Sequence, residues 1–151
     1  MVKKSLTKSL DLSYLESLMG YNARRAALAI IEDFNLRMVE IQLKPVEFSV
    51  LSLISRNPNI SAKEICSALF ILPPNIVSLL KSLESRGLIS RQIDDKDKRQ
   101  IALSLTNQGK LLIKKAEKMA TQSDKLTTQH ISSSEREQLI SLLKKIYQEA
   151  S

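Results

Sequence analysis

Apolar residues in the first quarter of the chain recur at steps of three and four, which is the period of an α-helix. The pattern predicts one long helix over residues 12–40, with an apolar stripe formed by Leu15, Leu18, Met19, Ala23, Ala26, Ile30, Phe34 and Met38. The preceding residues 1–11 are polar and basic, and they predict a loose N-terminal arm. A helix of this length cannot pack wholly against a small core, so we expect a partner chain to cover part of its stripe.

The next segment carries start and stop signals for two shorter helices. Pro45 predicts the first turn of one of them, because a proline at that position loses no helical hydrogen bond. The Asn-Pro-Asn segment at residues 57–59 ends this helix. Ser61 and Glu64 have the spacing of a capping box, in which each side chain bonds the other residue's backbone N–H, and they predict the start of a second, short helix.

A third helix follows a brief apolar break. Pro73 and Pro74 predict that it begins at or near Asn75, and it runs to Ser85. Gly87 is suited to the left-handed conformation that often ends a helix. The apolar residues that must face the core are Ile76, Leu79, Leu80 and Leu83.

Beyond Gly87 the apolar period changes from the helical one to an alternation. Residues 88–93 and 100–105 predict two strands, and the charged segment 94–99 predicts the turn between them. Thr106 can cap a helix that runs into the 120s, and residues 132–135 form a second capping box before a last helix. The last helix carries one apolar stripe of Leu139, Leu142, Leu143 and Ile146.

Two short helices with a tight break, followed by a hairpin, have the layout of a winged helix-turn-helix. We therefore predict a mainly α fold with a small β-hairpin wing, in which the second short helix is the candidate reader of the DNA major groove. Asn75 can pair with adenine, and Ser78 can bond base edges or phosphates, while Lys81 and Arg86 are better suited to phosphates. An ordinary amphipathic helix with a solvated face is the alternative. The predicted DNA contacts are Pro74, Asn75, Ser78, Lys81, Ser82, Arg86, Arg91, Lys96, Lys98 and Arg99.

The predicted wing tip mixes cations with acids. Lys96, Lys98 and Arg99 can insert into a narrow A·T-rich minor groove, which attracts such side chains. Asp94 and Asp97 would repel phosphates, so we expect a structural role for them, with Asp97 pairing within the wing and holding Arg99 or a neighbour in place. A plain solvated turn is the alternative.

The composition limits the classes of molecule that the protein can bind. The net charge of +7 fits either a protein that is merely basic or one that binds a polyanion. Aromatic residues make up only 4%, which supplies a stacking surface for single-stranded nucleic acid poorly. A single cysteine, Cys66, excludes an intramolecular disulfide, fits a reducing cytoplasm and is expected to be a buried, inert thiol rather than an oxidation sensor. One cysteine and one histidine cannot build a structural zinc site, and no apolar run has membrane-spanning length.

The segment 65–105 resembles the core of MarR-type regulators, the multiple antibiotic resistance regulator family. The resemblance rests on Leu79, Leu80, Arg91 and the run 83–89 (Leu-Glu-Ser-Arg-Gly-Leu-Ile), on a wing similar to Asp-x-Arg-Asp-x-Arg at 94–99, and on Leu-x-Leu-Thr-x-x-Gly at 103–109. Lys96 stands where the family usually has an arginine, and lysine lacks the planar fork.

The resemblance implies a single domain over residues 12–151. Its winged helix-turn-helix core would span 44–105, and interlocking dimerisation helices at 12–40 and 107–149 would form a homodimer. It also implies pseudo-palindromic operators and repression that a small ligand relieves.

The segment 18–26, together with Pro74-Asn75, resembles family members that respond to aromatic acids or their CoA thioesters. In this interpretation Tyr21, Arg24 and Arg25 bind the effector, because arginine can hold a carboxylate or a phosphate. An exposed basic helix face is the alternative interpretation of the same residues.

Together these features predict a cytoplasmic, sequence-specific regulator of transcription that binds double-stranded DNA, without cofactor, metal or membrane. A winged-helix module that binds an acidic protein is the competing hypothesis, and it predicts duplex binding without sequence selectivity. An enzyme is disfavoured, because no catalytic constellation is evident in the sequence.

Overall fold

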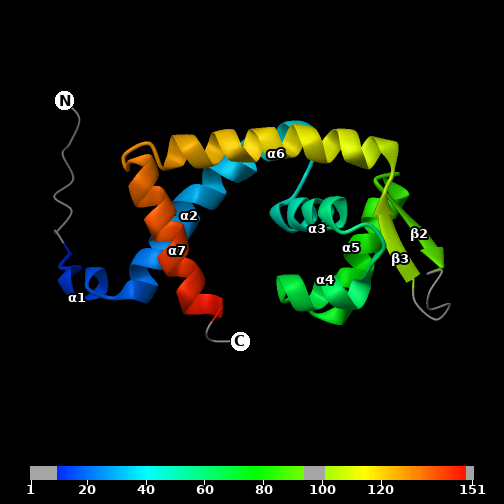
Figure 1. Cartoon of the computed structure of the whole chain (residues 1–151). Helices are drawn as coiled ribbons and strands as arrows, with labels where there is room; N and C mark the ends of the chain where they lie inside the picture. Colours follow the sequence, from blue (N-terminus) through cyan, green and yellow to red (C-terminus); the bar gives the residue numbers. More distant parts are fainter. Residues whose placement is uncertain (1–9, 94–100, 149–151) are drawn as a thin grey trace, which may run out of the picture.

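The computed structural model describes residues 10–93 and 101–148. Figure 1 shows α6 (Asn107–Thr127) spanning the molecule, with the small sheet near its N-terminal end and α7 (Ser133–Gln148) following its C-terminal end. Helix α2 (Met19–Met38) packs against α6, and so does α3 (Pro45–Arg56). Toward the N-terminal end of α6 lie the winged-helix elements, which are α3, α4 (Ala62–Leu69), α5 (Pro73–Ser85) and the sheet. Toward its C-terminal end lie α1 (Ser13–Glu16) and α7 (Figure 1).

The prediction of one uninterrupted helix over 12–40 is wrong at two places. The chain breaks between α1 and α2, where Leu18 is extended (φ −91°, ψ 129°), and the last turn tightens into a 3₁₀ helix, η1 (Val39–Ile41). The side-chain amide of Asn22 donates to the carbonyl oxygens of Glu16 (2.7 Å) and Leu18 (2.8 Å) at the break. Because the apolar period continues across this point, hydrophobicity alone does not reveal the interruption.

The predicted starts of α3, α4 and α6 are confirmed. The Glu64 N–H donates to Ser61 Oγ (3.3 Å) and the Ser61 N–H donates to Glu64 Oε2 (2.8 Å), which is the capping box at the start of α4. Helix α3 begins at Pro45, as predicted. Thr106 Oγ1 accepts from the Gly109 N–H (3.0 Å) at the start of α6.

Helix α5 begins at Pro73, two residues earlier than predicted. Proline fits the first turn, since its fixed φ is helical and its missing N–H would have no helical partner there. The break between α4 and α5 is made by Phe70 in the left-handed conformation (φ 53°), and the two helices bend by 117°. Gly87 has φ +68°, which confirms its predicted left-handed conformation after α5.

The predicted hairpin is confirmed by β2 (Ile89–Ile93) and β3 (Ile101–Leu105), which pair antiparallel with Ile89 opposite Leu105. A third strand was not predicted: β1 (Ile60–Ser61) pairs antiparallel with β3, giving the order β1-β3-β2. Two residues are too few to show an alternating pattern. The charged turn at 94–99 lies outside the described residues, so the expected pairing of Asp97 with Arg99 does as well.

The hydrophobic core lies between the winged-helix elements and α6. It is built from aliphatic side chains of α3, α4, α5, the sheet and α6, including Leu51, Ile54, Ile65, Ile76, Leu80, Leu83, Leu103 and Ile113. The predicted stripe of the first segment joins it only at its end, through the buried Met38 and the half-buried Phe34. In the single chain the rest of this stripe and the α7 stripe of Leu139, Leu142, Leu143 and Ile146 are exposed or nearly so.

Candidate nucleic-acid interface

Helix α5 presents two opposite faces. Ile76, Leu80 and Leu83 are buried and fix the helix to the core. The residues that point away from them include Ser78, whose Oγ donates to the Pro74 carbonyl (3.5 Å), and Lys81, which is exposed. This outer face is open to solvent.

The predicted reading residues fall on two sides of that face. Asn75, Ser78 and Ser82 line a groove of about 670 Å³ between α5, the start of α3 and the break at 70–72. Lys81 does not line this groove. The sequence pattern predicted that these four side chains lie on one helix. It did not predict which of them lie on the flank that faces α3.

Arg86 occupies a different environment from Lys81. Its Nη1 pairs with Glu47 Oε1 (3.1 Å) and its Nη2 donates to the Gln42 carbonyl (2.8 Å). Glu47 is buried, and its other oxygen accepts from the Lys44 N–H (2.9 Å). The guanidinium that was predicted to contact phosphate therefore ties the end of α5 to the start of α3, and sequence reasoning missed Glu47 as its partner.

The described part of the wing holds one predicted contact. Arg91 lies on β2, and its Nε pairs with Glu84 Oε2 (2.8 Å) at the end of α5. This pair joins the wing strand to the end of α5. Asp94, Lys96, Asp97, Lys98 and Arg99 lie outside the described residues.

The predicted effector residues lie together on the first turns of α2. Tyr21 is half-buried, and Arg24 and Arg25 are exposed. None of them lines the groove beside α5 or a second hollow of about 440 Å³ at the α2–α3 junction. Residues from the end of α2 and the loop after η1 form that second hollow, which the sequence did not indicate: Asn35, Val39, Gln42, Leu43, Lys44 and Pro45.

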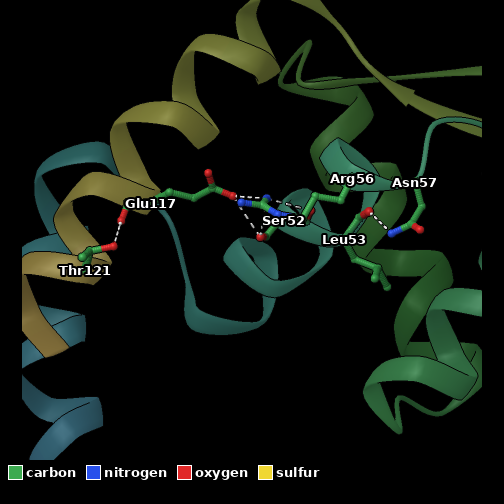
Figure 2. Close-up of polar contacts among 6 residues, drawn as sticks. All are labelled: Ser52, Leu53, Arg56, Asn57, Glu117 and Thr121. Atoms are coloured by element: carbon green, nitrogen blue, oxygen red, sulfur yellow. Dashed lines mark hydrogen bonds and ion pairs between the residues drawn. The ribbon is translucent and has the colours of Figure 1, made fainter. Parts of the chain in front are cut away.

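Polar links join α6 to the helices on both sides. Figure 2 shows Arg56 and Ser52 of α3 reaching Glu117 of α6, with Ser52 Oγ donating to Glu117 Oε1 (3.0 Å) and Arg56 forming an ion pair with the same carboxylate. The hydrogen bond from Arg56 lowers the pKa of Glu117 below its ordinary value.

A second link joins α2 to α6. The buried Ser123 Oγ donates to Asp33 Oδ2 (2.5 Å), and Arg37 pairs with the same carboxylate (2.7 Å). The hydrogen bonds from Arg37 and Ser123 lower the pKa of Asp33. Through these links α6 is bonded to α3 of the winged-helix elements on one side and to α2 on the other.

Other chemistry has little support in the part of the chain that the structure describes. No group of three or more histidine, cysteine or acidic residues there has the arrangement of a metal site. Cys66 is half-buried against the core, so it is less enclosed than predicted. No single described helix is long and apolar enough to cross a membrane. The bent pair α4–α5 passes that test by length and composition only.

A helix pair bent by 117°, with an exposed polar face on its second helix and a small antiparallel sheet after it, defines a winged helix-turn-helix DNA-binding protein. Residues 41–100 match the model of the MarR family. Two structures of the transcriptional repressor CouR are 37% identical to the chain and cover 91% of it: one bound to a 23-mer DNA duplex (TM-score 0.86, 98% of that chain), the other bound to p-coumaroyl-CoA (TM-score 0.81, 97% of that chain).

A Thauera aromatica protein named for transcriptional regulation of the hcr operon is 28% identical over 134 residues, which are 88% of this chain and 81% of that protein. MarR from E. coli, at 20% identity and a TM-score of 0.74 over 86% of this chain and 97% of its own, shares the fold. The chain belongs to the MarR family, and it is a DNA-binding transcriptional regulator rather than an enzyme. Regulators of this family act as dimers.

Proposed function

We propose that this regulator is a cytoplasmic, ligand-responsive repressor that binds a pseudo-palindromic operator as a homodimer. The observation that carries the proposal is the exposed outer face of α5, which is rigidly held by the core and carries Ser78 and Lys81. Other proposed DNA contacts are Pro74, Asn75, Ser82 and Arg91, and the wing cations Lys96, Lys98 and Arg99. We leave Arg86 out of this set, because both of its terminal nitrogens already bond protein oxygens.

The homodimer is supported by the apolar surface that one chain leaves uncovered. Exposed large apolar residues gather on α1, α2 and α7, the predicted dimerisation segments, among them Leu15, Met19, Ile31, Leu142 and Ile146. Large exposed apolar patches of this kind mark interaction sites. A symmetric dimer would place two copies of α5 at successive major grooves, which matches a pseudo-palindromic operator.

The proposed class of effector is supported by one relative and by two exposed arginines on α2. CouR, at 37% identity, was solved with p-coumaroyl-CoA, an aromatic acid thioester. Arg24 and Arg25 are exposed cations one residue apart on α2, which suits the phosphates of a CoA or the carboxylate of a free acid. We propose that an aromatic acid or its CoA thioester binds near Tyr21, Arg24 and Arg25 and weakens operator binding.

Selection from genomic fragments with the purified protein, repeated at two salt concentrations, tests the DNA part of the proposal. We expect one inverted repeat that persists at the higher salt. Lys81→Ala should weaken binding and flatten its salt dependence, because a phosphate contact releases counterions. Lys118→Ala removes the same charge from α6 and is the matched control. Random fragments that are lost at the higher salt would instead favour a basic winged-helix module without an operator.

Release of the protein from a labelled operator tests the effector part. We expect p-coumaroyl-CoA to release it at lower concentration than CoA alone, with free p-coumarate as the third probe. The double variant Arg24→Ala/Arg25→Ala should need at least roughly tenfold more thioester, because losing a charge-assisted hydrogen bond to the effector costs about 1.5 kcal/mol or more. Lys114→Ala/Lys118→Ala removes two charges from α6 and should respond like the wild type. Equal release by all three compounds would contradict the proposed class.

A further inference from the structure

The start of α5 exposes apolar side chains where a DNA-reading helix would enter the groove. Leu72, the N-cap residue, is 69% exposed, and Val77, one turn into the helix, is 60% exposed. They flank Pro73 and Pro74, which are also exposed. None of these four side chains serves the core, which α5 contacts through Ile76, Leu80 and Leu83.

The backbone at this helix start has no N–H group free to bind a phosphate. Pro73 and Pro74 lack the N–H altogether. The next two, on Asn75 and Ile76, both donate to the Leu72 carbonyl (3.0 and 3.2 Å). A helix N-terminus ordinarily offers such donors to anions. Here the first turn offers apolar surface instead.

Helical spacing places this surface next to the polar part of the outer face. Pro73, Val77 and Lys81 follow each other at intervals of four, and so do Pro74 and Ser78, so each set forms a row along the helix. Val77 therefore lies between the proline turn and a lysine that can reach a phosphate. An apolar first turn followed by a lysine one turn later suits the DNA major groove, which presents thymine methyl groups beside charged phosphates.

We propose that Leu72 and Val77 recognise the 5-methyl groups of thymines in the major groove of the operator. The proposal rests on the proposed function, in which α5 enters that groove. A thymine methyl is the apolar feature of a base edge in the major groove, and aliphatic side chains contact it. Burial of one such methyl is expected to change affinity by about fourfold. The prolines contribute by making the entry rigid and free of polar groups that would need partners.

The test replaces single thymines by deoxyuridine in one half-site of the selected operator, which removes only the methyl group. The wild type should lose about fourfold in affinity at one or two of these positions. Val77→Ala or Leu72→Ala should bind the thymine operator more weakly and no longer distinguish thymine from deoxyuridine at its own position. Both side chains are exposed, so the variants should fold as the wild type does.

Val39→Ala, which shortens an exposed valine in η1 outside the groove beside α5, is the matched control and should keep the wild-type discrimination. Selective operator binding with no effect of deoxyuridine, or with the same effect in both variants as in the wild type, would overturn this inference and leave the proposed function standing. Loss of all operator selectivity in the wild type would overturn both.

Discussion

Replacing Arg86 by methionine removes the charged partner of a carboxylate that has almost no access to water. The Glu47 side chain is 6% exposed and the Arg86 side chain 31% exposed in their ion pair. Breaking a buried pair from one side costs about 3–5 kcal/mol, because the remaining charge stays buried. Arg86 is partly solvated and Glu47 keeps the bond from the Lys44 N–H (2.9 Å), so we expect a lower cost of about 2–3 kcal/mol.

The pair between Arg91 and Glu84 is the matched control. Arg91 has the same side-chain exposure of 31%, but its acidic partner is 42% exposed. Arg91→Met should therefore cost less than about 1 kcal/mol, as exposed pairs do. The comparison isolates the burial of the acid as the cause of the difference.

Thermal and urea unfolding of the dimer at one fixed protomer concentration would measure both variants. For a chain of this size Arg86→Met should lower Tm by roughly 4–12 °C. In a Glu47→Gln background the same substitution should cost less, because no buried charge is left behind. The reasoning fails if Arg86→Met costs no more than Arg91→Met, or if the two substitutions at 47 and 86 are additive.

Three further predictions concern close packing, acid stability and the dimer. Gly109→Ala should lose at least about 2 kcal/mol in urea unfolding, because the new Cβ would lie 2.0 Å from the Leu88 carbonyl oxygen, whereas Gly20→Ala has no atom within 4 Å and should be neutral or slightly stabilising. The pKa of Glu117 lies below its ordinary 4.5, so its ion pair stabilises the fold above that pH and the contribution is lost as pH falls through the lowered pKa. Glu117→Gln should accordingly show a shallower loss of the urea midpoint below pH 4.5, and an unchanged acid limb would count against it. Leu142→Glu on the exposed stripe of α7 should shift the protein toward monomer in analytical ultracentrifugation and weaken operator binding, while an intact dimer would remove α7 from the interface.

Local signals in the sequence were enough for most element boundaries. The capping box of Ser61 and Glu64 and the Thr106 cap each join groups three residues apart, so their spacing along the chain is nearly their spacing in space. Gly87 could be predicted for the same reason, since its left-handed conformation is a property of one residue. The alternating strands and the helix periods likewise report on neighbours within a few residues.

Local signals also missed two features of the backbone. The apolar period ran through the break at Leu18, because it records which side chains avoid water and not which backbone bonds are made. Strand β1 forms only because β3 offers it a partner more than 40 residues later. Strand β1 therefore depends on where a distant part of the chain is placed, whereas the break at Leu18 is bonded locally by the Asn22 amide.

The candidate interface shows the same division. The sequence by itself determined that α5 has an apolar and a polar face, and that Ser78 and Lys81 lie on the polar one. Only the tertiary structure decided that Arg86 bonds Glu47, 39 residues away, and that Ser123 bonds Asp33, 90 residues away. A side chain's partner across such distances is set by how helices pack, since burial makes an unpaired charge or hydroxyl costly and selects whichever group the fold brings within reach.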